Sequence, residues 1–368
     1  MVCQDVAAFT SSYPRVTNYL NRPFEGRLDN GGERITLSRL DESNRWVTVD
    51  TIKYRDGGPA DGDGPSLELV HPGFARLRDQ CYGAWAPSTS TNGTPGARNS
   101  VYDPDPPPVV EYVLHDPPIP PGDSVVRIRA RATARDSDVL SVQLLYRKDA
   151  IPTNSWNVVT MHDDALDGDE VAGDGVYSAY VPPFGKPLMQ AGDMLKFRIV
   201  VSDGSLSRIY PAESTAGVEG SNLSYLCQFL EDDYRDCAYP REYPTYYLLM
   251  TQTNRAVLEK RNRYSNDLLD STVITSAGEI FYNSGVRYRG GSTRGGNEAS
   301  PPYISYHVEF PRGQKLDGFQ DIGFNHSWAQ TTFIGMTLMA RAGYDCYAPD
   351  VQLCRLWLNT NNLAVQNS

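Results

Sequence analysis

Apolar and polar residues alternate along several short stretches of the chain. Between Leu195 and Val201 every second residue is apolar, and the same spacing recurs over Val126–Ala132 and Val142–Tyr146. A period of two places successive side chains on opposite faces, so each stretch predicts a strand with one buried face. Trp156 and Val158 continue the pattern. Because turn residues separate these strands at short intervals, the middle of the chain is predicted to form a β-sandwich.

The regions on either side also contain predicted strands. Arg34–Ser38 and Ser66–Leu69 alternate, and Trp46–Tyr54 is rich in β-branched and aromatic residues. Such residues favour half-buried strands. In the last third, Tyr246–Met250 predicts the first strand of a third module.

Two helices are predicted in the last third. The first runs from about Asn254 to Asn262, with Asn254 as its N-cap, because an Asn side chain can accept a hydrogen bond from the first turn. The second runs from about Ala329 to Ala342 and ends at Gly343, since glycine commonly follows the last helical residue.

Composition supports a mainly β protein with rigid connections. The chain has 26 Pro, 31 Gly and 23 Tyr among 368 residues, which is typical of a turn-rich β protein. Prolines cluster between Tyr102 and Pro121, where they favour an extended, semi-rigid spacer. The predicted organisation is a first module at 1–99, a linker at 100–121, an immunoglobulin or fibronectin III-like sandwich at 122–215, a linker at 216–243 and a third module at 244–368.

Charge and hydropathy exclude two classes of partner. The 45 acidic and 34 basic residues give a formal charge of -11, whereas a nucleic-acid surface needs net positive charge. No apolar run approaches the ~18 residues that span a bilayer. Residues 1–20 have neither a basic start nor an apolar block, so no export signal is recognised.

Six cysteines fall into three local pairs: Cys3 with Cys81, Cys227 with Cys237, and Cys346 with Cys354. An even number with local pairing favours disulfides and an oxidising compartment. Six buried thiols are the alternative, and spacing does not choose between them. A metal site at these residues is disfavoured because no CxxC or Cys/His cluster occurs.

The first module resembles part of the lamin-tail domain, an immunoglobulin-like sandwich. The matching segments are Gly26–Leu37, Asp50–Tyr54, Asp63–Leu69, Trp85 and Gly93–Asn99. The opening strands of that family have no counterpart here, so the resemblance implies that residue 1 lies inside a domain. A sandwich without those strands would expose unpaired backbone and half of a core.

The third module resembles the front half of the spore-coat CotH kinase family. The ordered landmarks are Glu279–Arg294, Ser305–Phe310, Gly318, Asn325 and Arg355–Asn359. The resemblance implies a nucleotide-facing glycine loop, and the candidate nucleotide-binding residues are Arg287, Arg289, Gly290, Gly291, Ser292 and Arg294. Glycines let backbone N–H groups approach an anion, and arginines match phosphate with two donors. A β-hairpin with solvated arginines is the alternative.

Several parts of a phosphotransferase have no match in this sequence. The family carries a lysine in the strand that corresponds to Tyr303–Phe310, and none occurs here. The carboxylates that hold Mg²⁺ lie, in that family, beyond the point where this sequence ends. The prediction is therefore no catalytic residue and no cofactor for this chain, with ATP and magnesium expected only in an intact kinase parent. His307 is expected to be a strand-surface residue.

The segment Asp163–Gly175 is dense in aspartate and glycine. Hard oxygen ligands within one loop suit Ca²⁺, and the candidates are Asp163, Asp167, Asp169 and Asp174. The spacing matches an EF-hand-like loop only in part, because Ala165 occupies the third position and no helices flank it. A hairpin turn without metal is the alternative, since Asp and Gly also dominate turns.

Two functions from different classes follow. The first is a secreted or cell-surface bacterial multidomain protein whose sandwiches serve adhesion, display or spacing, with an unidentified protein or cell-envelope partner. The second is a CotH-type ATP-dependent protein kinase whose catalytic second half is missing from this chain. The predicted fold is mainly β: two immunoglobulin-like β-sandwiches followed by a partial α+β kinase-like lobe.

Overall fold

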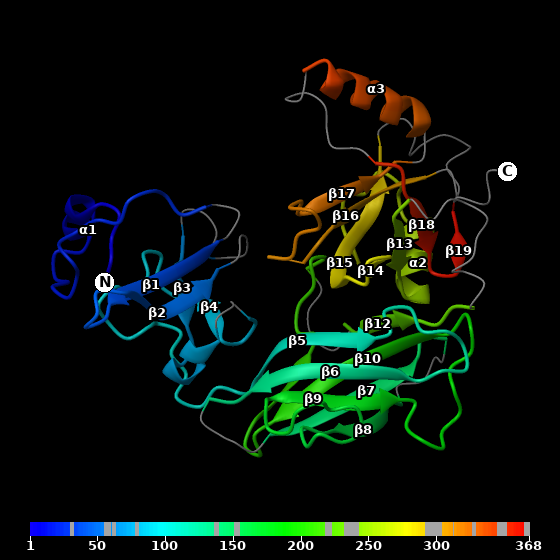
Figure 1. Cartoon of the computed structure of the whole chain (residues 1–368), viewed down its shortest axis with the longest axis horizontal. Coiled ribbons are helices and arrows are strands. Elements are labelled where there is room, and N and C mark those ends of the chain that lie inside the picture. Colours follow the sequence, from blue (N-terminus) through cyan, green and yellow to red (C-terminus); the bar gives the residue numbers. More distant parts are fainter. Residues whose placement is uncertain are drawn as a thin grey trace. The chain divides into compact units, whose positions relative to one another are not determined.

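The computed structural model shows a mainly β chain with several antiparallel sheets (Figure 1). It describes residues 1–29, 33–54, 60, 64–77, 81–135, 140–150, 155–217, 223–231, 243–290, 304–311, 313–325, 329–343 and 352–363. Within this part, no helix is long and apolar enough to cross a membrane. Contacts divide the chain into two compact units. One comprises Met1–Tyr112, Ala130–Val142 and Val201–Arg208, and the other comprises Val113–Arg129, Gln143–Val200 and Ile209–Ser368.

The N-terminal region contains two small two-stranded sheets. Its elements are α1 (Val6–Ser12), β1 (Arg34–Leu40), β2 (Trp46–Lys53), β3 (Leu67–Leu69), the 3-10 helix η1 (Pro72–Arg76) and β4 (Trp85–Pro87). β1 pairs with β2, and β3 pairs with β4, both antiparallel. A compact cluster of Phe74, Leu77, Cys81, Ala84 and Val109 is buried next to β3 and β4. In contrast, β1 and β2 leave apolar side chains in solvent, among them Leu37 at 52% and Trp46 at 73% exposure.

The middle of the chain forms two sheets, which we call the two-sheet module. One sheet has the order β5 (Val109–Asp116), β6 (Val126–Thr133), β9 (Val176–Val181). The other has the order β11 (Ser207–Tyr210), β10 (Met194–Ser202), β7 (Ser141–Lys148), β8 (Asn157–Met161), and β12 (Tyr225–Gln228) also pairs with β10. Burial alternates along β6 and β10 as their apolar spacing predicts, so that prediction is confirmed.

The last third forms one curled, half-barrel sheet of seven strands (Figure 1). Its order is β17 (Asp321–Phe324), β16 (Ser305–Glu309), β15 (Ile280–Arg289), β14 (Leu269–Thr275), β13 (Thr245–Leu249), β18 (Arg355–Leu358), β19 (Asn361–Asn362). All described pairs are antiparallel except β13 with β18, which run parallel. One face of this sheet carries a core of fully buried residues that includes Leu248, Val273, Val308 and Phe310.

Both predicted helices are present, with one correction. Helix α2 (Gln252–Lys260) is capped by Thr251, whose side chain accepts from the amide of Asn254. The predicted cap Asn254 instead lies in the first turn, and its side chain donates to the carbonyl of Asp270 in β14. Helix α3 (Ala329–Arg341) agrees with the prediction, and Gly343 follows it with φ 83°.

A junction joins the two-sheet module to the seven-stranded sheet within the second compact unit. Met194 and Leu226 of the module pack with Leu249 and Ile274 of the sheet in one buried cluster. Burying this apolar surface favours association of the two parts.

Polar contacts surround that apolar cluster. His115 at the end of β5 hydrogen-bonds through Nδ1 to the hydroxyl of Tyr282 in β15. The side-chain amide nitrogen of Asn283 donates to the backbone carbonyl of Ser224 at 3.3 Å. Asp149 accepts from the backbone N–H of Gln252, the first residue of α2, at 2.6 Å. A carboxylate at a helix N-terminus is favourable because the helix dipole is positive there.

Candidate functional site

The described candidate arginines lie on one face of the strands β15 and β16. Arg287 pairs with His307 and Arg289 pairs with Ser305 in the antiparallel register. Directly opposed residues share a face, so these four side chains form one polar surface, which we call the arginine face. Asn325, just beyond β17, extends this surface because the hydroxyl of Ser305 donates to its Oδ1 at 2.9 Å.

Close packing holds Arg289 against β17. A Cβ added to Gly323 would lie 1.4 Å from a guanidinium nitrogen of Arg289, so the arginine occupies the space that the glycine leaves. His307 lies 3.7 Å from a carboxylate oxygen of Asp321. The intervening residues Tyr288 and Tyr306 point to the other face and belong to the buried core.

The charges on this face limit what it can bind. Arg287 and Arg289 supply two guanidinium groups. The acidic residues Glu309 and Asp321 lie opposite each other in the register, two residues beyond the pair of His307 and Gly323. The more positive end of the arginine face therefore lies towards Gly290. The φ of this residue is 108°, a conformation that favours glycine. An anion at that end would meet guanidinium donors, which suits phosphate or carboxylate. Gly291, Ser292 and Arg294 lie outside the described residues.

The sequence did not indicate Ser305, Asp321 and Asn325 as neighbours of the arginines. Their positions depend on the register between β15, β16 and β17. Alternation predicts which residues of one strand share a face, but it does not predict which residue of the next strand lies opposite. His307 was expected to be a strand-surface residue; it lies on β16, and its side chain is partly buried, at 18% exposure.

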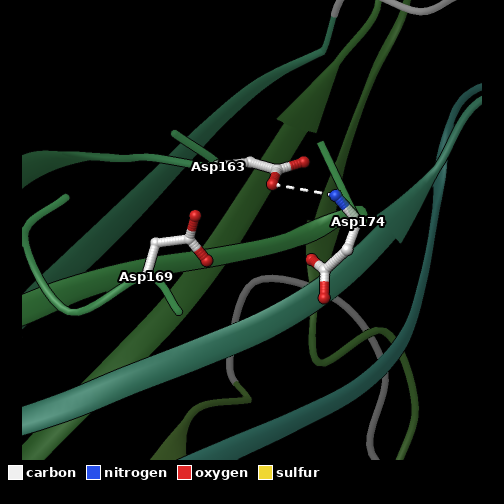
Figure 2. Close-up of side chains that lie close together, drawn as sticks. All are labelled: Asp163, Asp169 and Asp174. Carbon is white, nitrogen blue, oxygen red and sulfur yellow. Dashed lines mark hydrogen bonds between the residues drawn. The ribbon is translucent and has the colours of Figure 1, made fainter. Parts of the chain in front are cut away.

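Three of the four predicted calcium ligands come together in the loop between β8 and β9. Carboxylate oxygens of Asp163, Asp169 and Asp174 lie within 4.8 Å of one another. Figure 2 shows the three side chains gathered in this loop. Asp167 is not part of this group, and its φ of 48° places it in a tight turn.

The carboxylate of Asp163 organises this loop. It accepts hydrogen bonds from the backbone N–H groups of Gly173 at 2.7 Å, Asp174 at 3.2 Å and Gly175 at 2.9 Å. The side chain of Asp169 accepts from the N–H of Ala165 at 2.6 Å. These hydrogen bonds explain why aspartates occur in this loop as turn-forming residues. The carboxylate oxygens also lie close together, and such oxygens are the ligands that Ca²⁺ prefers. Both interpretations of the loop therefore stand.

The described cysteines show no disulfide between Cys3 and Cys81. Cys227 is fully buried in β12 and Cys354 lies next to β18, both as thiols. Burial raises the pKa of Cys227 and raises that of Cys354 to about 11, so both thiols stay protonated near neutral pH. Their predicted partners Cys237 and Cys346 lie outside the described residues, and pairing stays a prediction.

Comparison with known proteins found no match to any protein family, any curated protein or any solved structure.

Proposed function

We propose that this chain is part of an extracellular or cell-surface bacterial protein, in which β modules provide display, adhesion and spacing. In this proposal the N-terminal region is a portion of a lamin-tail domain and the two-sheet module is an immunoglobulin-like sandwich. The seven-stranded sheet corresponds to the front half of a CotH-type lobe, and it serves as a binding module. These assignments rest on the resemblances in the sequence.

The junction between the two-sheet module and the seven-stranded sheet is the observation that supports a spacing role. Modules within one chain commonly move relative to each other because their interfaces are small and polar. Here an apolar cluster is combined with buried side-chain hydrogen bonds from His115 and Asn283. Buried polar groups need specific partners, so such an interface favours one arrangement. A display protein benefits from this stiffness because it holds a binding surface at a fixed distance from its anchor.

Cell-surface exposure tests this function directly. An antibody raised against residues 109–230 should label intact cells of the producing organism, and protease added outside should remove the label. Beads coated with the full chain should also be retained by isolated cell envelopes, in contrast to beads coated with denatured chain. Labelling that requires lysis, with no retention on envelopes, would refute the proposal.

A phosphotransferase is the second candidate, and the arginine face is the observation that favours it. Arg287 and Arg289 share one face with His307, and a guanidinium or imidazolium could pair with phosphate in place of the missing lysine. We nevertheless expect no phosphate transfer by this chain, because stabilising a transferring phosphoryl group depends on bound metal.

The kinase assay uses the full chain with labelled ATP, Mg²⁺ or Mn²⁺ and a generic acceptor protein. The expected result is no label above a no-protein control. Metal-dependent labelling that disappears in Arg289→Ala would establish the kinase activity, and Arg341→Ala, in the last turn of α3, provides the matched control.

A further inference from the structure

A carboxylate lies inside the junction with little to compensate its charge. Asp270 is on β14 and is only 6% exposed. The amide nitrogen of Asn283 donates to both of its oxygens, at 3.1 Å and 3.3 Å. The same nitrogen also reaches the carbonyl of Ser224 on the two-sheet module. Within the described part of the chain, the side-chain donor to the buried carboxyl group of Asp270 is thus the amide of Asn283, which carries no charge.

The cation that acts on Asp270, Lys196, already has another partner. Lys196 of β10 lies 3.3 Å from a carboxylate oxygen of Asp149, and that carboxylate also binds the N-terminus of α2. The attraction of Lys196 is therefore shared between two acids. A buried charge that lacks its own counter-charge is costly, so Asp270 is better accommodated with a proton.

The other titratable groups around the junction do not supply a charge at neutral pH. Burial raises the pKa of Tyr225, Cys227 and Tyr282, and burial lowers the pKa of His115 to about 4. All four are therefore neutral near pH 7. The charged residues on the remaining neighbouring elements are Lys196 and Arg198 on β10, Asp149 after β7, Arg255, Glu259 and Lys260 on α2, and Arg287 and Arg289 on β15. Arg255 and Glu259 pair with each other, and Lys196 pairs with Asp149.

We propose that the protonation state of Asp270 controls the stability of the junction between the two-sheet module and the seven-stranded sheet. The junction is stable while this carboxyl group carries a proton, and it weakens when the proton leaves. The carboxyl group is then a neutral member of the Asn283 and Ser224 contact. After ionisation it becomes a buried carboxylate that competes with Asp149 for Lys196. The junction responds in this way whether or not the protein acts at a cell surface.

The direction of the pH effect follows from linkage. Burial raises the pKa of Asp270 from 3.8 to about 7, against the opposing effects of Asn283 and Lys196. The folded protein holds this proton more tightly than the unfolded chain does. The resulting stabilisation is complete below the unfolded pKa and is lost as the pH rises through about 7.

His115 produces an opposite slope at lower pH. Burial lowers the pKa of His115 from 6.5 to about 4, so its contribution to stability is fully present above pH 6.5 and is lost as the pH falls towards 4. The two slopes oppose each other over the acidic range, so the pH profile of the wild-type protein does not isolate either group. Above pH 6.5, His115 is mostly neutral in both the folded and the unfolded chain, so it offsets little of the slope from Asp270.

The test compares the full chain with Asp270→Asn, which keeps the shape of the side chain and removes its titration. Equilibrium unfolding is measured from pH 5 to 8. We expect the ratio of the wild-type to the variant unfolding constant to rise about tenfold per pH unit up to the pKa of about 7 and then to level off. Asp267→Asn, an exposed neighbour, is the matched control. A constant ratio for Asp270→Asn would overturn the proposal.

A second measurement decides the question if Asp270→Asn does not fold. Carboxyl ¹³C resonances of aspartate-labelled wild-type protein are followed from pH 3 to 9. The resonance of Asp270 should titrate near 7. Over the same range, the protection of the Gln252 amide, which donates across the junction to Asp149, should fall as Asp270 ionises. A midpoint near the ordinary aspartate value of 3.8, or protection that does not follow the titration, would overturn the proposal.

Discussion

His115 and Tyr282 are 167 positions apart in the sequence and share a buried hydrogen bond. The Nε2 atom of His115 lies 2.9 Å from the carbonyl oxygen of Pro118, which can only accept, so Nε2 carries the proton and donates it. A neutral imidazole then has a lone pair on Nδ1, and the Tyr282 hydroxyl donates to it. This assignment fixes the tautomer of His115 and makes Tyr282 the donor in the pair.

Removing the hydroxyl should therefore destabilise the protein. We expect Tyr282→Phe to lower the free energy of unfolding by about 1–3 kcal/mol, because Nδ1 of a fully buried histidine loses its donor. Chemical denaturation measures this change. The control is Tyr180→Phe, whose side chain is 41% exposed and whose change should stay within about 0.5 kcal/mol. Equal effects of the two substitutions would contradict the assignment.

The protonation state of His115 provides a separate prediction. Burial lowers its pKa to about 4, so its imidazole should stay neutral throughout mildly acidic conditions. As the pH falls from 6.5 to 4, the protein should lose about 3 kcal/mol of stability from this group. Side-chain ¹⁵N resonances of His115 report the titration. A midpoint near 6.5 would show that the imidazole is not buried in the neutral form.

The loop between β8 and β9 should depend on Asp163 more than on its neighbours. We expect Asp163→Asn to lower the free energy of unfolding by about 1–2 kcal/mol, because one of its two oxygens accepts from Gly173 and Asp174 and the other from Gly175. The matched variant Asp167→Asn lies outside this contact and should change stability by less than about 0.5 kcal/mol. The reverse order of effects would show that Asp163 does not organise the loop.

Calcium binding at the same loop is tested by calorimetric titration with Ca²⁺. If the full chain binds this ion here, the double variant Asp169→Asn, Asp174→Asn should abolish the heat, because it removes the charge of two of the three clustered carboxylates. Equal heats for wild-type and double-variant protein would exclude the loop as the site.

Disulfides remain predicted for Cys227 with Cys237 and for Cys346 with Cys354. Peptide mapping without reductant, after expression in an oxidising compartment, should recover both cross-links. Because burial keeps the Cys227 thiol protonated, its pairing is expected to precede the folding of β12. Recovery of all four residues as free thiols would contradict the prediction.

Local patterns predicted several strands of this fold but not its junction. The alternation in β6 and β10 indicated their buried faces, because a period of two is a property of each strand alone. Asp270 lies within β14 and Asn283 within β15, and nothing in the sequence around them distinguishes them from other strand residues. Their role depends on which module packs against this sheet, and no local spacing contains that information.

The arginine face shows the same limit at a shorter range. Arg287 and Arg289 were expected in a glycine loop, but the structure places both on β15, where residues two apart share a face. Their neighbours His307 and Ser305 depend on the register of β16. The displaced cap of α2 depends on a contact with another strand. Thr251 and Asn254 both suit an N-cap, but the side chain of Asn254 donates to the carbonyl of Asp270 in β14.

The most direct test of this account measures whether the two-sheet module and the seven-stranded sheet tumble as one body. Residual dipolar couplings are collected for backbone amides of β7 and β12 in the module and of β14 and β15 in the sheet, on the unmodified full chain. The junction of His115, Tyr282, Asn283 and Ser224 predicts that a single alignment tensor fits both sets. Two tensors of different magnitude would show that the parts move independently, and that result would contradict the account.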